Sequence, residues 1–375
     1  MINKVKNIIR NNYVNIRGWS TNRRILLIES DDWGAIKMPS KEVYDVLKAK
    51  GIPVDSSYFS KYDCLETEKD LTDLFQVLTN FKDINGNNLC ITANTIVANP
   101  DFEKIKGNGF TKYEYELFTE TYERYGEHKA FSIFKEGIDK HILFPQFHGR
   151  EHINPAEWMS VLNKGNKLEM LAFENKVLLG IDTTKASTRY LNYTSAFNYE
   201  SLEEKDTFKE IIEEGTKHFK NIFGFHSKSF VPPCGIKGYE LDEILFNNHI
   251  QYLQSGRLFE PDGNGGVIAK NHFWGDKNVF GQFYWRRNGT FEPSRDWHYD
   301  WENSIMKEAE YAFRWGKPLV LNSHRVNYSG GIDPKNRENT LILLSKIVKK
   351  LQAKYPNLEF MSSDQLGDLI KSTSK

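Results

Sequence analysis

Short apolar runs alternate with stretches of helical spacing along most of this 375-residue chain. Each run has the length of a buried strand and ends in polar or turn-forming residues. Such runs are found at residues 24–30, 89–97, 141–152, 175–182, 228–235, 251–256, 318–325 and 358–363. Helices are predicted at 40–51, 66–80, 112–138, 201–220, 239–250, 301–317, 335–353 and 364–372, and another begins at Asn154-Pro155. The alternation favours a parallel sheet or barrel covered by helices, which places the chain in the α/β class.

No internal repeat, low-complexity block or linker interrupts the chain, so we predict a single domain over residues 1–375. This length is sufficient for one large α/β domain. Two stretches fit the alternation less well. We expect an insertion at about 55–140 and an elaboration near the mouth of the site at about 255–300.

The charge balance limits the classes of partner. Lysine plus arginine and aspartate plus glutamate each number 50, so the net charge is zero. This balance argues against nucleic acid as the main partner, because phosphate binding requires a basic excess. No stretch approaches the roughly 20 apolar residues of a membrane span, and the first residues lack the apolar core of a signal peptide. We expect a cytoplasmic protein without a transmembrane segment; an amphipathic N-terminal helix resting on a membrane is the alternative.

Two motifs at predicted strand ends can hold a metal ion. Asp31 and Asp32 follow the first apolar run, and one carboxylate can bind a metal while the other faces a substrate. His148 and His152 follow the third run, and their i,i+4 spacing lets both imidazoles reach one ion. With one carboxylate they form a 2-His-1-carboxylate set. The alternatives are a capped βα turn and a pair of surface histidines.

Three further motifs place polar and aromatic side chains at strand ends. His324 ends the run LVLNSH, where it can act as a general acid or simply pack or cap. Aspartates and tryptophans in DWHYDW, residues 296–301, suit sugar binding, although Asp300 can equally cap the following helix. VPPCG, residues 231–235, predicts a rigid turn in which Cys234 is a packed side chain rather than a nucleophile.

The five motifs SDDWG, HGREH, VPPCG, DWHYDW and LVLNSH occur in the order and type of the polysaccharide deacetylase family, the carbohydrate esterases with a NodB homology domain. The resemblance covers roughly residues 24–325, most of the chain. It implies a distorted (β/α)7-type barrel with helical and loop insertions. It also implies a carbohydrate substrate.

The resemblance also implies roles for individual residues. Asp32, His148 and His152 correspond to the metal ligands, Asp31 to the catalytic base and His324 to the general acid. We predict one divalent metal: zinc suits this set best, and cobalt, nickel, manganese or iron would fit a similar geometry. The predicted substrate-binding residues are Trp33, Pro233, Asp296, Asp300 and Trp301. Of these, Trp301 with Asp300 or Asp296 resembles the motif that shapes the groove and tunes the catalytic histidine.

The chain departs from the family pattern in two places. Val231 stands where the family has the arginine that orients the base. The candidates to replace that arginine are Arg150, Arg295 and Arg325. The interval between the aspartate pair and the two histidines is also longer than usual in the family.

Taken with the resemblance, these residues predict a metal-dependent hydrolase that removes an acyl group, above all N-acetyl, from a carbohydrate in surface-polysaccharide biosynthesis. Asp31 would take a proton from the attacking water, and His324 would protonate the leaving group. Without an export signal, the expected substrate is an intracellular nucleotide- or lipid-linked sugar. Two other interpretations stand: a catalytically silent member that binds a glycan or a partner protein, and a glycosidase that uses two carboxylates.

Overall fold

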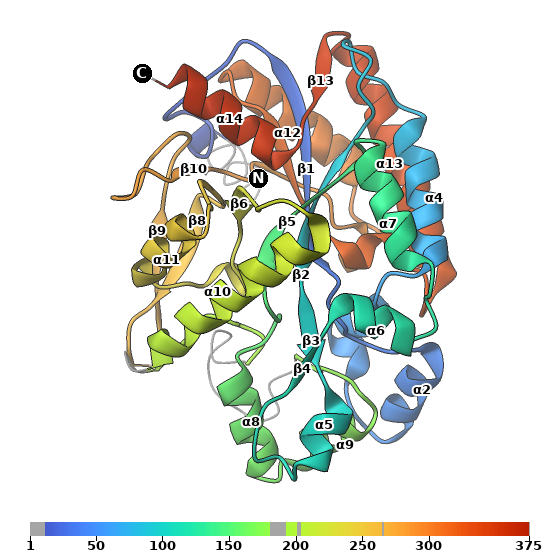
Figure 1. Ribbon diagram of the computed structural model, residues 1–375. Coiled ribbons are helices and arrows are strands. Elements are labelled where there is room, and N and C mark those ends of the chain that lie inside the picture. The colour runs from blue at the N-terminus through green and yellow to red at the C-terminus, as the bar shows by residue number, and fades with distance from the viewer. Residues whose placement is uncertain (1–11, 181–192, 201–203, 265, 375) are drawn as a thin grey trace, which may run out of the picture.

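The computed structural model of the protein describes residues 12–180, 193–200, 204–264 and 266–374. The centre of the molecule is a curled sheet of parallel strands surrounded by helices (Figure 1). The strand order is β10-β7-β6-β5-β2-β1-β12-β11, and β13 pairs with the first residues of β1. The predicted α/β class and distorted barrel are therefore confirmed, with eight strands along the main path in place of seven.

The central strands of this sheet are almost entirely buried. β1 (Arg24–Trp33) lies between β2 (Ile91–Ile96) and β12 (Leu319–His324). The other strands of the sheet are β5 (Leu143–Gly149), β6 (Ser229–Phe230), β7 (Tyr252–Gln254), β10 (Phe283–Trp285), β11 (Gly289–Thr290) and β13 (Leu358–Phe360). Such burial is expected of a parallel sheet whose outer face is covered by helices.

The two edges of the sheet lie close together. β10 ends at Trp285 on one edge, and β11 begins at Gly289 on the other. Residues 286–288 alone connect them, and a segment of this length spans at most about 14 Å. The sheet is therefore curled into a barrel, and the chain itself bridges the gap between the two edge strands.

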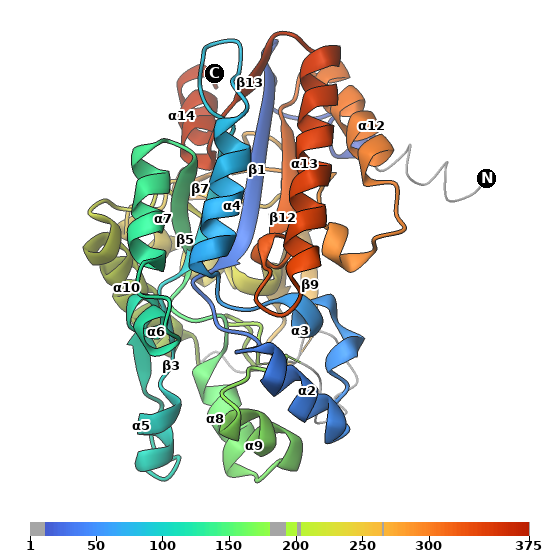
Figure 2. The same ribbon diagram turned by 90° about the vertical axis from the view of Figure 1, so that its right-hand side faces the viewer.

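Helices cover the outside of the barrel. α4 (Glu68–Thr79), α7 (Ala130–Asp139), α12 (Trp301–Arg314) and α13 (Pro334–Lys354) stand along one flank (Figure 2). Their apolar side chains share one core cluster with β1, β2 and β12. α10 (Glu204–Phe223), α11 (Asp242–Asn247) and α14 (Ser363–Thr373) complete the cover. Within the described ranges, no helix combines the length and the apolar character needed to cross a bilayer.

Side-chain caps set the start of several helices, as the sequence predicted. Ser40 caps α2 (Lys41–Ala49), Asn154 caps α8 (Pro155–Asn163) and Asp300 caps α12. Each accepts a hydrogen bond from the backbone N–H three residues further on. A polar residue before a periodic apolar segment therefore marked these helix starts correctly.

The carboxyl end of the barrel carries most of the additional structure. α2, α3 (Tyr58–Tyr62), α5 (Phe102–Gly107), α8 and α9 (Lys167–Glu174) gather at the end where β1 and β5 finish (Figures 1 and 2). A small antiparallel sheet of β3 (Ala98–Pro100) and β4 (Tyr115–Leu117) lies near them (Figure 1). These elements surround the residues that follow the barrel strands.

Several predicted segments differ from the structure. The stretch 55–140 contains β2, α4 and α7, which belong to the barrel, so only part of it extends beyond the barrel, including α3, β3, α5, β4 and α6 (Phe118–Arg124). The predicted helix at 112–138 begins as β4, because those residues pair with β3. Within 255–300, β8 (Arg257–Pro261) and β9 (Val267–Asn271) form a separate hairpin, whereas β10 and β11 are barrel strands.

The apolar run at 175–182 is not a strand over its described part, residues 175–180. Val177, Leu178 and Leu179 are nevertheless buried in two of the core clusters. Their apolar character reflects this burial rather than pairing in a sheet. Residues 181 and 182 of the run, like 201–203 of the predicted helix at 201–220, lie outside the described residues.

Candidate active site

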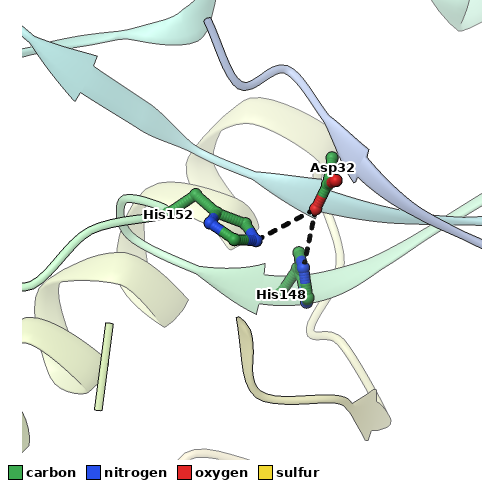
Figure 3. A group of neighbouring side chains, drawn as sticks. All are labelled: Asp32, His148 and His152. Atoms are coloured by element: carbon green, nitrogen blue, oxygen red, sulfur yellow. Dashed lines mark hydrogen bonds and ion pairs between the residues drawn. The ribbon is translucent and has the colours of Figure 1, made fainter. Parts of the chain in front are cut away.

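Asp32, His148 and His152 converge at the carboxyl end of the barrel (Figure 3). Asp32 Oδ1 lies 3.3 Å from His148 Nε2 and 3.1 Å from His152 Nε2. One ligand atom from each residue lies within 4.8 Å of the other two. Both contacts are longer than the about 2.7–2.9 Å of a charge-assisted hydrogen bond. Two imidazole nitrogens and a carboxylate oxygen around one point fit a divalent ion.

The backbone of β1 turns Asp32 toward the histidines. Asp32 has a φ of 74°, and the pairing of β1 with β2 shifts register between Ser30 and Trp33. A non-glycine residue in this left-handed region is uncommon, and such strain concentrates at functional sites. Adjacent strand residues normally point to opposite faces. Here the irregularity lets both Asp31 and Asp32 line the same cavity.

Hydrogen bonding fixes the ring of His148. Its Nδ1–H donates to the backbone carbonyl of Val231 at 2.7 Å. A carbonyl oxygen can only accept, so Nδ1 carries a proton and Nε2 is the ring nitrogen that faces Asp32. Burial raises the pKa of Asp32, but the two histidines outweigh burial and hold it well below the usual value. Asp32 is thus ionised, as a metal ligand must be.

Asp31, the neighbour of Asp32 on β1, is held by an arginine. Arg287 Nη1 donates to Asp31 Oδ2 at 2.6 Å, and Nη2 donates to Oδ1 at 2.8 Å. Asn94 Nδ2 also donates to Oδ1, at 2.7 Å. Burial raises the pKa of Asp31, but Arg287 outweighs it and lowers the pKa to about 2. The carboxylate is therefore ionised and fixed in orientation.

Arg287 comes from the segment that bridges the two edges of the barrel, and its side chain is 10% exposed. Besides Asp31 it donates to Glu29 Oε2 and Asn322 Oδ1, each at 2.6 Å. Its guanidinium thus joins β1, β12 and the bridge between the edge strands. No sequence motif identified Arg287, because the segment around it matches none of the family patterns.

The three arginines expected to replace the motif arginine are engaged elsewhere. Arg150 binds Glu151 and Glu214. Arg325 binds Asp63 and Glu66. Arg295 lies over the ring of Trp301. Each has a nearer partner than Asp31, so the expectation that one of them orients the base is corrected in favour of Arg287.

His324 lies beside Asp31 at the end of β12. Its Nδ1 is 2.5 Å from Glu292 Oε1, and its Nε2 is 3.9 Å from Asp31 Oδ2. Burial lowers the pKa of His324, but the Glu292 carboxylate outweighs burial and raises it to about 10. The imidazole is therefore protonated at neutral pH, with Nε2–H on the side of Asp31. No sequence motif marked Glu292, which follows no predicted strand.

Replacing Glu292 by glutamine is expected to move the alkaline limb of the pH–rate profile toward neutrality by about two pH units or more. In the native protein the raised pKa keeps His324 protonated up to about pH 10. Without the carboxylate, burial would favour the neutral ring. Profiles of catalytic rate against pH for Glu292→Gln and for Glu243→Gln, an exposed control on α11, check this. An unchanged alkaline limb would show that Glu292 does not set the protonation of His324.

One cavity of about 620 Å³ connects these residues. The five predicted metal-binding and catalytic residues Asp31, Asp32, His148, His152 and His324 all line it. Side chains that the sequence did not single out line it as well, namely Lys37, Tyr58, Phe59, Asp63, Arg287 and Glu292. Cys234 is also on the wall, and desolvation raises the pKa of its thiol, which disfavours the nucleophilic thiolate.

The structure does not bring the predicted substrate-binding residues to this cavity. Trp33 is 1% exposed and belongs to the main core cluster, where its ring stacks on Tyr328. Pro233 is buried in the turn after β6. Asp300 caps α12, and Trp301 is a buried side chain whose Nε1–H donates to the carbonyl of Asp296. The DWHYDW segment thus builds a helix start beside the cavity rather than its wall.

No protein-family model matches the chain, and no curated protein matches it in sequence. Among the solved structures similar to the chain is one from Mycobacterium smegmatis that carries the name polysaccharide deacetylase. The two sequences are 11% identical, the match covers 95% of this chain and 93% of that chain, and the TM-score is 0.43. Another with that name, from Pseudomonas aeruginosa PAO1, has 7% identity, coverages of 94% and 93%, and a TM-score of 0.46. A structure named as an allantoinase has 8% identity, coverages of 95% and 93%, and a TM-score of 0.45.

Proposed function

We propose that the protein is a metal-dependent hydrolase that removes an N-acetyl group from a carbohydrate. The observation that carries the proposal is the assembly, in one cavity, of a carboxylate fixed by Arg287, a protonated histidine and a three-residue metal set. Hydrolysis of an amide needs such a base, an acid and a group that polarises the carbonyl. The carbohydrate substrate is expected from the five sequence motifs. A role in surface-polysaccharide synthesis and a location in the cytoplasm stay predictions.

The proposed metal site consists of Asp32, His148 and His152. Zinc is the proposed ion, because two imidazoles and one carboxylate with open positions are a common catalytic zinc set. When bound, such an ion lowers the pKa of a water molecule and polarises the acyl carbonyl. The hydrogen bond from His148 to Val231 keeps the imidazole oriented for this task.

Asp31 acts as the proton acceptor in this proposal. Its pKa of about 2 keeps it ionised across the neutral range, and Arg287 and Asn94 fix its two oxygens. A carboxylate with so low a pKa is a weak base. Asp31 would therefore orient the attacking water and accept its proton, because the bound metal would already have lowered the pKa of that water.

His324 acts as the proton donor. Glu292 holds Nδ1–H, which leaves Nε2–H free to protonate the amide nitrogen as its bond to the acyl carbon breaks. The acyl carbon gains the oxygen of the water, and the nitrogen leaves as a free amine. For an N-acetyl sugar the products are acetate and an amino sugar.

The catalytically silent alternative was motivated by the valine at position 231. Arg287 argues against this alternative, because its guanidinium forms a bidentate pair with Asp31, although it comes from the segment between β10 and β11 rather than from position 231. The glycosidase alternative would give Asp32 and the two histidines no task. We therefore favour the hydrolase.

Acetate release from N-acetylated amino sugars, measured together with bound metal, tests the proposal. Purified protein is expected to release acetate, to lose this activity when a chelator removes the metal, and to regain it when zinc is added. Release of reducing sugar ends without acetate would support the glycosidase. Sugar binding without any turnover in the zinc-loaded protein would support the silent binder.

His152→Ala is expected to weaken zinc affinity about tenfold or more, because one of three protein ligands is lost. Activity is expected to fall in proportion to metal occupancy and to recover in part at higher zinc concentration. Metal analysis and acetate release on the same samples measure both effects. His128→Ala removes an exposed histidine that pairs with Glu123 and is the matched control. Full metal content in His152→Ala would contradict the assigned ligand set.

A further inference from the structure

The carboxylates that line the cavity are all engaged by groups of the protein. The partners are Arg287 for Asp31, His148 and His152 for Asp32, Arg325 for Asp63, and His324 for Glu292. Among the cavity-lining residues that the structure describes, no carboxylate is left to compensate a further positive charge. A divalent ion at the proposed metal site would be offset in part by Asp32, its carboxylate ligand, and would still add one positive charge.

Lys37 brings such a further charge into the cavity. Its side chain is half-buried and lines the cavity wall. Its Nζ lies against Gly180, where an added Cβ would be only 2.5 Å from that nitrogen. Within the described ranges, no hydrogen bond or ion pair joins the Lys37 ammonium to another residue. The absence of a side chain at Gly180 is therefore what leaves room for the ammonium.

The surroundings of Lys37 disfavour an uncompensated charge. Burial lowers its pKa, and Asp63 and Asp32 oppose this shift only from a distance. Arg295 is a second cation at the same cavity, with an exposed side chain whose guanidinium lies 5.6 Å from the centre of the Trp301 ring. Among the residues that the structure describes, no carboxylate forms an ion pair with it. A partly desolvated ammonium costs free energy unless an anion lies beside it. An anion bound beside Lys37 would remove this cost.

We propose that Lys37 binds an anionic group of the substrate, a carboxylate or a phosphate carried by the acylated sugar. The inference rests on the proposed deacetylase function and narrows its substrate class to anionic sugars. The Lys37 ammonium donates hydrogen bonds to the oxygens of that group. Arg295 at the rim attracts the same charge as the substrate approaches.

Four probes that share one acetamido sugar test this inference. N-acetylglucosamine is neutral, its uronic acid carries a carboxylate at C6, and its 6-phosphate and 1-phosphate carry phosphate at either end. Zinc-loaded wild-type protein is expected to release acetate from at least one anionic probe with a kcat/KM about tenfold or more above that of the neutral sugar. The carboxylate and phosphate arms identify which anion is preferred. Equal values for all four probes would overturn the inference.

Lys37→Met is expected to reduce the ratio of anionic to neutral kcat/KM by about tenfold. Lys37→Arg retains the charge and is expected to restore most of the ratio. Lys37→Gln serves if the methionine variant does not fold. The control is Lys41→Met, which removes a solvent-exposed lysine paired with Asp45 and is expected to leave the ratio unchanged. An unchanged ratio in the Lys37 variants would assign anion preference to another group.

A binding experiment separates this inference from the proposed function. Titration calorimetry with the same four probes uses zinc-loaded Asp31→Asn protein, with and without Lys37→Met, so that no turnover is needed. Tighter binding of an anionic probe that depends on Lys37 supports the anion site even when no probe releases acetate. In that case the deacetylase proposal fails alone. Acetate release without any dependence of binding or rate on Lys37 leaves the deacetylase proposal standing and overturns the anion site.

Discussion

Asp31→Asn is expected to lower acetate release about 1,000-fold while the bound metal stays in place. Asparagine has nearly the shape of aspartate, but it cannot accept the proton of the attacking water. The three proposed metal ligands do not include Asp31, whose carboxylate contacts Arg287 and Asn94 instead. The loss is therefore expected in kcat, with little change in metal content.

Acetate release and metal analysis on the same preparation measure the two effects. Asp45→Asn, which alters an exposed carboxylate paired with Lys41, controls for loss of one negative charge. Loss of metal together with activity in Asp31→Asn would instead place Asp31 among the metal ligands. Full activity in this variant would remove Asp31 from the role of base.

Arg287→Met is expected to lower kcat/KM about 100-fold and to move the acid limb of the pH–rate profile upward. In the native protein Arg287 outweighs burial and lowers the pKa of Asp31 to about 2. Without the guanidinium, burial would raise that pKa against only the smaller opposing effects of His148 and His324, so the base would be protonated at higher pH. If Arg287 served only to fill space, its replacement would lower the rate without moving the acid limb of the pH–rate profile.

The same substitution is expected to destabilise the fold by about 3–5 kcal/mol, because it leaves buried carboxylates without their cation. The lowered pKa of Asp31 contributes stability that is present above its unfolded value of about 4 and is lost as the pH falls toward 2. Arg287→Met is expected to lack this contribution. The free energy of unfolding, measured by denaturation at several pH values, tests this expectation. The control is Arg314→Met, which changes an exposed arginine on α12.

Arg287→Lys separates charge from geometry. Lysine keeps the positive charge but cannot hold both oxygens of Asp31 in a bidentate pair. The acid limb of the pH–rate profile of Arg287→Lys is expected to stay near that of the native protein, while the kcat/KM of this variant is expected to fall about tenfold. Wild-type pH dependence in the methionine variant would contradict the assignment of Arg287 to Asp31.

The features that could be predicted from the sequence are those that one chain segment specifies by itself. The apolar run at 24–30 and the polar pair after it are adjacent in the chain, so the strand and the position of Asp31 and Asp32 follow directly. His148 and His152 share one turn after β5 and converge on Asp32 for the same reason. A strand end fixes where such side chains emerge.

The features that could not be predicted depend on contacts between distant segments. Arg287 is 256 residues from Asp31, and nothing beside it in the sequence marks it as a partner. Trp33 follows the aspartate pair and is predicted from the sequence to bind substrate, but Phe134 and Tyr328 from other elements pack against its ring in the core. The local sequence pattern predicts the strand or helix to which a side chain belongs. Whether that side chain is buried depends on which distant segments pack against it.

The bridge between β10 and β11 has a consequence for the order in which the site can form. Glu29 and Asp31 are synthesised early, and their guanidinium partner emerges 258 and 256 residues later. Contacts of such separation form late, because a long loop must close first. A nascent chain that lacks the bridge cannot bury β1 without leaving two carboxylates unpaired. We therefore expect closure of the barrel and the fixing of the Asp31 carboxylate to occur together. A ribosome-bound fragment ending before residue 287 is expected to be both unfolded around β1 and inactive.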